Sequence, residues 1–278
     1  MNVVLKAALA ATLAAVLATG AAQVAGATTS PGSSVTAPAG QRTTVQATVS
    51  APVASFITAL YNDFLSRNPS SDDIAWWGHN LATGSPRGAV AAGFVDSDEY
   101  RLIRIDAAYR DILTREAEPG GRASWLNGMK IGLLTTDDIE RSLYASDEFY
   151  NDNGGNEFGW INGLYEHILG RGASMDEVGY WLNQGNAYAL AQSDWIHQPP
   201  GVDIPLVFPR LWIVNNIMNS TEGARSRVSA MYQHYLGRVP DAGGLALWAN
   251  YDLAVGDSAT RSGLTGSDEY FALASQRF

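Results

Sequence analysis

Four arginines are the side chains whose type and spacing most directly suggest chemistry. Each follows a tyrosine by six residues, and the four are Arg67, Arg115, Arg171 and Arg238. A guanidinium group binds a carboxylate or a phosphate through two parallel hydrogen bonds, so a row of four could form an anion-binding surface. A Ser-x-Glu sequence, typical of a helix start, also follows each arginine. We therefore expect each arginine to pair with a helix-start acid, and Arg115 to reach Glu148 or Glu99.

Histidines and oxygen-rich turns are the candidate metal ligands. His167 and His234 each stand two residues after a repeated tyrosine, a position that lies off the apolar face of a helix, so we expect them at the surface. Residues 151–157 are rich in side-chain oxygens and could hold calcium, but they lack the alternating ligands of an EF-hand loop. A plain turn is predicted there. No metal site and no cofactor is predicted.

The sequence carries none of the common catalytic signatures. It has no Gly-x-Ser-x-Gly elbow, no His-Glu-x-x-His pair and no Walker loop, and its two lysines are Lys6 and Lys130. The absence of cysteine excludes disulfides, thiolate nucleophiles and zinc–cysteine sites. No catalytic residue is predicted. A glycosidase-type carboxylate pair stays open, because the 28 acidic residues allow many pairs.

The arginines belong to an internal repeat that defines four segments. The chain aligns on Tyr61, Tyr109, Tyr165 and Tyr232, which mark segments one to four in chain order. In each segment a leucine follows the tyrosine by four residues and a tryptophan follows it by sixteen. These tryptophans are Trp77, Trp125, Trp181 and Trp248. We expect the tyrosines and tryptophans to form the core of each segment.

Hydrophobic spacing around each tyrosine predicts an α-helix. Apolar residues at −4, −1, 0, +3 and +4 form one stripe on such a helix. A turn, a second helix with the tryptophan and a third helix follow, and the Ser-x-Glu start leads into the next segment. No helix breaker occurs between Ser97 and Arg115, so one helix should cross from segment one into segment two. Gly154-Gly155 should interrupt the corresponding helix after Ser146.

The predicted fold is all-α: a tandem array of about four three-helix repeats of about 48 residues each. Repeats one and two are predicted over residues 52–153. Repeat three is predicted over 154–226 and repeat four over 227–278.

Segment three contains about nineteen additional residues, within 186–209. Long stretches without helix or strand periodicity are commonly functional or disordered. Trp195, His197, Asp194 and Asp203 are the candidate binding residues in this insertion, because exposed tryptophans often anchor binding contacts. The alternative is an inert excursion whose Trp195 folds back on the helices.

Together, Tyr-x3-Leu-x-Arg, the turn Pro240-Asp241-Ala242-Gly243, the tryptophan and the Ser-x-Glu-aromatic sequence resemble domain-of-unknown-function family 4214. Segment four matches best, and the resemblance covers about residues 56–278. Segments one to three depart from the Pro-Asp-x-x-Gly turn. Members of this family occur in exported bacterial proteins, including surface-layer and RTX-type chains. The resemblance implies no catalytic residues. The helical pattern is also similar to the protein-binding linker domains of phycobilisomes.

Residues 1–27 are predicted to be a signal peptide. Lys6 is followed by an apolar stretch over Ala7–Ala18, and Ala25-Gly26-Ala27 fits the small-x-small cleavage pattern. The alternative is an uncleaved anchor, but a span needs roughly 20 apolar residues. No transmembrane segment is expected after cleavage. Residues 28–51 are rich in Ser, Thr and Ala and are predicted to be a disordered linker.

Composition limits the functional classes. Apolar residues make up 46% of the chain, which predicts a folded core. The net charge of −10 argues against nucleic acid, which requires a basic surface. We expect a secreted or cell-surface, non-enzymatic repeat protein that binds an unknown protein or an envelope polysaccharide. The alternative is a secreted hydrolase or glycan-processing protein with its site in the insertion of segment three.

Overall fold

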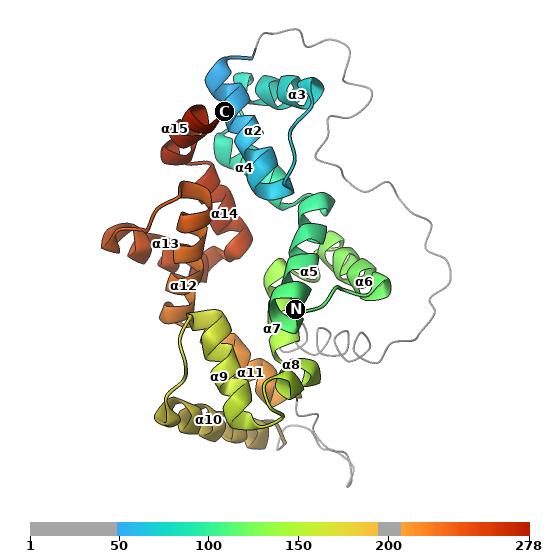
Figure 1. The fold of residues 1–278 in the computed structure, drawn as a ribbon, viewed down its shortest axis with the longest axis vertical. Helices are drawn as coiled ribbons and strands as arrows, with labels where there is room; N and C mark the ends of the chain where they lie inside the picture. Colours follow the sequence, from blue (N-terminus) through green and yellow to red (C-terminus); the bar gives the residue numbers. More distant parts are fainter. Residues whose placement is uncertain (1–48, 194–206) are drawn as a thin grey trace. The chain divides into compact units, whose positions relative to one another are not determined.

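The computed structural model describes residues 49–193 and 207–278, and this part of the chain is all-helical without any β-strand (Figure 1). Its elements, in chain order, are α2 (Ala51–Leu65), α3 (Ser71–Ala82), α4 (Arg87–Val95), α5 (Asp98–Leu113), α6 (Pro119–Lys130), α7 (Thr136–Tyr144), α8 (Asp147–Asp152), α9 (Glu157–Leu164), η2 (Tyr165–Leu169), α10 (Met175–Ser193), α11 (Val207–Met218), α12 (Thr221–Met231), η3 (Tyr232–Leu236), α13 (Ala242–Val255), α14 (Asp257–Thr265) and α15 (Asp268–Arg277). The elements η2 and η3 are single π-helical turns.

The described helices divide into two compact units. The central unit comprises residues 105–193 and 207–226, and the terminal unit comprises 49–104 and 227–278. In the central unit α11 packs against α7 and α10, and α9 packs against α8. In the terminal unit α14 packs against α4 and α15 packs against α2 (Figure 1). The chain therefore passes between the units within two helices, α5 and α12.

The apolar stripe around each repeated tyrosine forms the core of its segment, as the spacing predicts. At −4, −1, 0, +3 and +4, every position in the four segments is buried except Leu169, which is half-buried. The four tyrosines are 0–5% exposed. Burial of nineteen of these twenty apolar side chains supplies the main driving force for this arrangement.

The repeated tryptophans lie in or near the core. Trp77 and Trp125 are buried, whereas Trp181 and Trp248 are half-buried. The indole N–H of Trp181 donates a hydrogen bond to the hydroxyl of Tyr165 at 2.8 Å, so the second helix is fixed to the tyrosine helix. A Cβ added to Gly263 would lie only 2.9 Å from the ring of Trp248, so glycine makes room there for the tryptophan.

Serine side chains cap the helices that follow the third helix of each segment. The Oγ atoms accept hydrogen bonds of 3.0–3.2 Å from the backbone N–H three residues later, and the serines are Ser97, Ser146, Ser220 and Ser267. The uninterrupted helix expected after Ser97 is present as α5. The interruption expected after Ser146 is also present, because α8 ends at Asp152 and α9 begins at Glu157, with positive φ at Gly154 and Gly155.

The insertion of segment three is partly helical. The second helix of this segment, α10, continues to Ser193, and α11 begins at Val207. Sequence reasoning treats all of 186–209 as lacking periodicity, but residues 187–193 contain three alanines, a leucine and a glutamine, which favour a helix whatever their spacing. Helix α10 is nonetheless continuous through residues 186–193.

Candidate functional site

Each repeated arginine makes a bidentate pair with the Ser-x-Glu acid of its own segment. Nε and Nη2 of Arg67 donate to the two carboxylate oxygens of Glu99 at 2.6 and 2.9 Å. The same fork joins Arg115 to Glu148, as expected. The remaining pairs have distances of 2.5–3.0 Å and are Arg171 with Glu222 and Arg238 with Glu269. The predicted arginine–acid pairing is therefore confirmed in all four segments.

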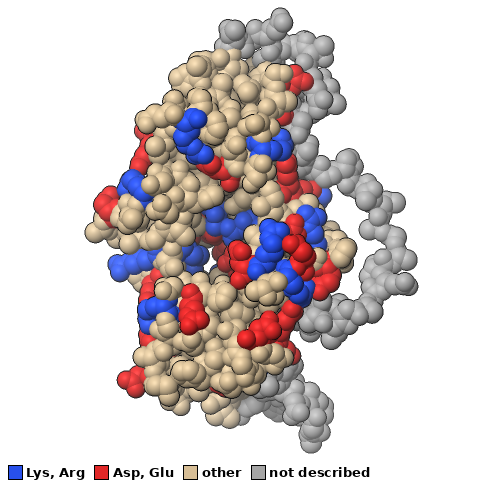
Figure 2. Space-filling model, in the orientation of Figure 1, with Lys and Arg blue, Asp and Glu red and all other residues tan. Residues whose placement is uncertain are grey.

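Each of these guanidinium groups also lies over the ring of its segment's tyrosine. The distances from Cζ to the ring centroid are 4.7–5.1 Å. Hydrogen bonds to the arginines lower the pKa of Glu222 and of Glu269, and burial opposes this effect in both. Because the glutamate binds the N–H edge of each guanidinium group and the tyrosine ring covers one of its faces, the four arginines join the start of the Ser-x-Glu helix to the tyrosine helix instead of forming an anion-binding row. Figure 2 accordingly shows basic and acidic side chains interspersed on the visible face.

A second set of arginine contacts joins different segments and was not predicted from the sequence. In the terminal unit, Arg87 pairs with Asp268 and lies 4.7 Å from the ring centroid of Phe271. In the central unit, Arg210 Nη1 donates to Asp147 Oδ1 at 2.7 Å and lies 3.9 Å from the ring centroid of Tyr150. Both arginines stand ten residues before their serine cap, and both acids stand one residue after theirs. That shared register is the signal that could have found them.

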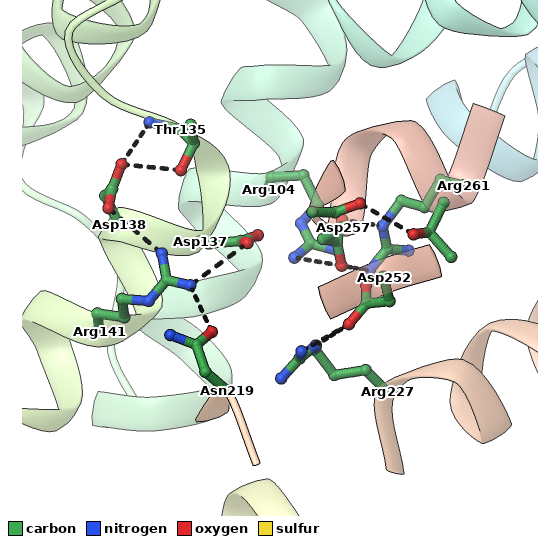
Figure 3. A network of polar contacts seen from close by, with 12 residues as sticks. Arg104, Thr135, Asp137, Asp138, Arg141, Asn219, Arg227, Asp252, Asp257 and Arg261 are labelled. Carbon is green, nitrogen blue, oxygen red and sulfur yellow. Dashed lines mark hydrogen bonds and ion pairs between the residues drawn. The ribbon is translucent and has the colours of Figure 1, made fainter. Parts of the chain in front are cut away.

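The terminal unit also contains a buried charged cluster, drawn in Figure 3. Nε and Nη2 of Arg261 donate to the carboxylate of Asp257 at 2.5 and 2.7 Å, and Arg104 lies 3.9 Å from the same carboxylate. Arg227 Nη2 donates to Asp252 Oδ2 at 2.6 Å. The two aspartate side chains are only 4% and 1% exposed.

The electrostatics of this cluster do not suit general acid catalysis. Burial raises the pKa of Asp257, but Arg261 and Arg104 lower it more, so the net pKa lies below the usual value. A general acid needs a raised pKa. The arginines instead hold Asp257 ionised, as expected of a structural anchor for the first turn of α14.

A separate cluster of polar residues in the central unit, also drawn in Figure 3, caps α7, the third helix of segment two, and links it to α11. Thr135 caps α7 together with Asp138, whose carboxylate accepts hydrogen bonds of 2.8 Å from the backbone N–H and the hydroxyl of Thr135. Arg141 lies 3.3 Å from Asp138 and 3.7 Å from Asp137. Arg141 also reaches the side-chain oxygen of Asn219 at 3.4 Å, which links α7 to the end of α11.

A shallow, open pocket of about 520 Å³ lies in the terminal unit between α2, α3, α4 and α15. Its lining is mostly aliphatic and aromatic and consists of Val53, Leu81, Ser85, Pro86, Arg87, Gly88, Gly266 and Phe271. The charged group among them, the Arg87 guanidinium, is engaged by Asp268 and by the Phe271 ring. Leu211 occupies the position in segment three that Gly88 occupies in segment one and is buried. A Cβ added to Gly88 would have only the carbonyl oxygen of Ser262 within 4 Å, at 3.9 Å, so the glycine leaves this part of the pocket open.

The predicted binding residues of the insertion lie outside the described part of the chain. These residues are Asp194, Trp195, His197 and Asp203. The helices on both sides of them are described and closely packed. The rings of Tyr188 on α10 and Trp212 on α11 are stacked, with centroids 5.3 Å apart and planes at 20°. Ile213 of α11 lies so near Gly185 of α10 that an added Cβ would be 2.8 Å from it.

The other candidate ligands form no site among the described residues. His167 is exposed beside the rings of Tyr144 and Phe149, and His234 is exposed as well. The oxygen-rich run around Gly154 is a turn, as expected, in which Asn156 accepts a hydrogen bond from Gly159 N–H at 3.0 Å. Within residues 49–193 and 207–278, no group of three or more His, Asp or Glu side chains could hold a metal ion.

No helix among the described residues is long and apolar enough to span a bilayer. The family model described as "Domain of unknown function (DUF4214)" matches residues 44–102, which include α2 to α4 and the start of α5. This region is segment one with its serine cap. Comparisons with curated proteins and with solved structures found no match.

Proposed function

We propose that this protein is an exported, non-enzymatic array of about four three-helix repeats, which binds another protein or an envelope polymer through the insertion of segment three. The observation that carries the proposal is the stacked pair of Tyr188 and Trp212 at the base of that insertion. It holds α10 and α11 together where the added residues leave and re-enter the fold. A rigid stem that presents a long connection is a common way to build a binding site.

The repeat assignment is supported by contacts that recur in every segment. The fork from arginine to glutamate and the guanidinium over the tyrosine ring occur four times at the same sequence positions. The family match over 44–102 supports the family assignment for segment one, and the shared pattern extends the resemblance to the other three. Recurring residues are thus explained by packing, which leaves the residues unique to segment three to determine specificity.

Export is supported by the sequence before the first described helix. A basic residue, an apolar stretch and a small-x-small site occur in the order found in signal peptides, and a Ser/Thr-rich linker follows. The resemblance to a family found in surface-layer and RTX-type proteins points to the same compartment. We therefore place the mature protein outside the cytoplasm, at or near the cell envelope.

Deletion of the insertion tests the proposed function. Residues 192–203 are replaced by a Gly-Ser bridge, and the variant is compared with the full chain in pull-downs from envelope extract. We expect partner capture to be lost while the melting temperature and helix content stay nearly unchanged, because α10 and α11 pack through residues before and after the deletion. Retained capture would move the binding site onto the repeat surface.

A point variant provides the matched control. Trp195→Ala/His197→Ala should weaken capture, whereas His167→Ala/His234→Ala, which alters exposed histidines on the tyrosine helices, should not. If instead the Trp195 variant unfolds the central unit, the tryptophan belongs to the core and the proposal is wrong. Measured turnover of a glycan or peptide that depends on His197 or Asp203 would favour the hydrolase alternative.

A further inference from the structure

The four segments fall into two types that alternate along the chain. Segments one and three carry Pro-Arg at the start of their third helix, at Pro86-Arg87 and Pro209-Arg210, and an aromatic residue five positions before their tyrosine, Phe56 and Trp160. In segments two and four, the residue five positions before the tyrosine is an arginine, and an aromatic residue lies four positions after the serine cap. These residues are Arg104 and Tyr150 in segment two, and Arg227 and Phe271 in segment four. We call the first type odd and the second type even.

Each compact unit pairs one odd segment with one even segment, and the contacts correspond. Arg87 of odd segment one meets Asp268 and Phe271 of even segment four. Arg210 of odd segment three meets Asp147 and Tyr150 of even segment two. In a pair of two odd segments, these arginines would face Arg101 or Ala224, which stand four positions after the serine caps of the odd segments, instead of an aromatic ring. A pair of two even segments would lack the arginine altogether. The interface is therefore specific for unlike segments.

The two interfaces differ in how their halves are connected. In the central unit, the even helix α8 is joined to the odd helix α9 by the short turn over residues 153–156. In the terminal unit, no short turn joins the corresponding helices α15 and α2, and non-covalent contacts hold them together. The hydroxyl of Ser55 donates to the carbonyl oxygen of Phe278 at 2.7 Å across 223 positions of sequence.

The interface between segments one and four nevertheless contains close aromatic, backbone and ionic contacts. The buried Phe56 ring lies 6.0 Å from Tyr270 and 5.5 Å from Phe271, measured between centroids. Helices α4 and α14 approach closely at two glycines, where a Cβ on Gly266 would lie 2.5 Å from the Cα of Gly88. Tyr270 and Arg277 of α15 both donate to the carboxylate of Asp63 on α2, at 2.6–2.8 Å.

We propose that segment four can pair with segment one of a second copy of this chain, so that the terminal unit also forms between molecules by exchange. The contacts described above for the terminal unit would be kept in such a dimer, and only the connections through α5 and α12 would change their course. Exchange of an identical element is an economical route to dimers, because the two forms bury the same surfaces. The linked arrangement wins at low concentration, since the tether raises the effective concentration of the two halves.

Cysteine trapping in the full chain tests the proposal, because the native sequence contains no cysteine. Ser55→Cys and Phe278→Cys are prepared as separate chains of different mass, denatured together, refolded together at high concentration and oxidised. We expect a disulfide-linked dimer, twice the 29.7 kDa of one chain, that contains one copy of each variant. The double variant Ser55→Cys/Phe278→Cys, refolded at low concentration, should give an internally bridged monomer. This control shows that the two positions can form the bond.

A charge-reversal pair supplies an independent readout by analytical ultracentrifugation. Arg87→Glu and Asp268→Arg each place like charges together within one chain, but both contacts are restored in a mixed exchanged dimer. Co-refolding the two variants should give several-fold more dimer than either alone. The control mixture of Arg210→Glu with Asp147→Arg should give no such increase, because the turn over 153–156 keeps those segments together. The proposal would be overturned if the mixed single cysteine variants and the mixed Arg87→Glu and Asp268→Arg variants gave only monomers while the double cysteine variant formed its internal bridge.

Discussion

The indole N–H of Trp125 donates a hydrogen bond to the hydroxyl of Tyr109, 16 residues earlier, at 3.2 Å. Both rings are almost fully buried, at 1% and 2% exposure. Burial is the main reason that the pKa of Tyr109 is raised. The bond satisfies two polar groups inside the core and fixes α6 to α5. It is therefore a structural contact within segment two.

Replacing Trp125 should strongly destabilise the central unit. Trp125→Ala removes a fully buried aromatic ring, which costs about 3–5 kcal/mol of unfolding free energy. Trp125→Phe keeps most of the ring and should cost less, with the unpaired Tyr109 hydroxyl contributing about 1–3 kcal/mol. Urea unfolding followed by circular dichroism measures both. The half-buried Trp248 provides the comparison, since Trp248→Ala should cost less than Trp125→Ala. Equal losses would mean that burial does not govern these positions.

The pair of Arg67 and Glu99 should contribute modestly to stability. Both side chains are 33% exposed, so solvent screening limits the contribution to about 1 kcal/mol or less. A double-mutant cycle with Arg67→Met and Glu99→Gln measures the coupling, which should weaken at high salt. Arg110→Met is the control, because Arg110 pairs with Glu116 only at 3.5 Å and both are largely exposed. Coupling that is absent at low salt would contradict the assigned role.

The recurring local contacts could be predicted from the sequence, because each depends on spacing within one segment. The arginine–glutamate forks, the serine caps and the break at Gly154-Gly155 follow from helix periodicity and capping chemistry repeated four times. Repetition removes coincidence, so a weak local preference becomes a firm expectation. The same argument placed the tyrosines and tryptophans in the core.

The pairing of segment one with segment four was not predicted, because it joins residues far apart in the chain. A tandem array suggests that neighbours pack in order, and local periodicity contains no information about which distant segment meets which. The signal lay in a difference between segments at the position ten residues before the serine cap. Arg87 and Arg210 occupy this position in segments one and three, whereas Thr136 and Asp257 occupy it in segments two and four. Aligning the segments for what they share conceals these differences. In the buried cluster, the contact of Arg104 with Asp257 belongs to the same class of non-local contacts.

Acid should destabilise segment three through Glu177. Hydrogen bonds from Arg171 and from the backbone of Ser174 lower the pKa of Glu177 to about 2. A carboxyl group whose pKa is lowered in the folded state stabilises the fold above its unfolded pKa near 4.5, and this contribution is lost as the pH falls toward 2. The melting temperature should therefore fall between about pH 4.5 and pH 2. Glu177→Gln should reduce the slope of melting temperature against pH, and a slope identical to that of the wild type would contradict this assignment.

We predict that residues 1–27 act as a signal peptide and are cleaved off after Ala27. The order of Lys6, the apolar stretch and Ala25-Gly26-Ala27 motivates this expectation. Mass spectrometry of the protein recovered outside the cytoplasm should show an N-terminus at Thr28. Ala25→Asp/Ala27→Asp should block processing, because the peptidase requires small residues at these sites. An intact Met1 on a membrane-bound wild-type product would show that the segment is an anchor.

Glycine at position 93 should be required for the packing of α4 on Trp77. An added Cβ would lie 2.8 Å from the far edge of the Trp77 ring, closer than van der Waals contact allows. Trp77 is buried and stacks on Phe94 at 5.1 Å, so the ring has little room to move. Gly93→Ala should therefore cost about 1–3 kcal/mol through overpacking, although alanine favours the helix.

Gly120→Ala in the first turn of α6 is the matched control, because nothing lies within 4 Å of its added Cβ. That variant should be neutral or gain about 0.4–1 kcal/mol from reduced entropy of the unfolded chain. Thermal melts of the two variants decide the matter, and a Gly93→Ala protein as stable as the Gly120→Ala protein would show that the Trp77 ring can shift.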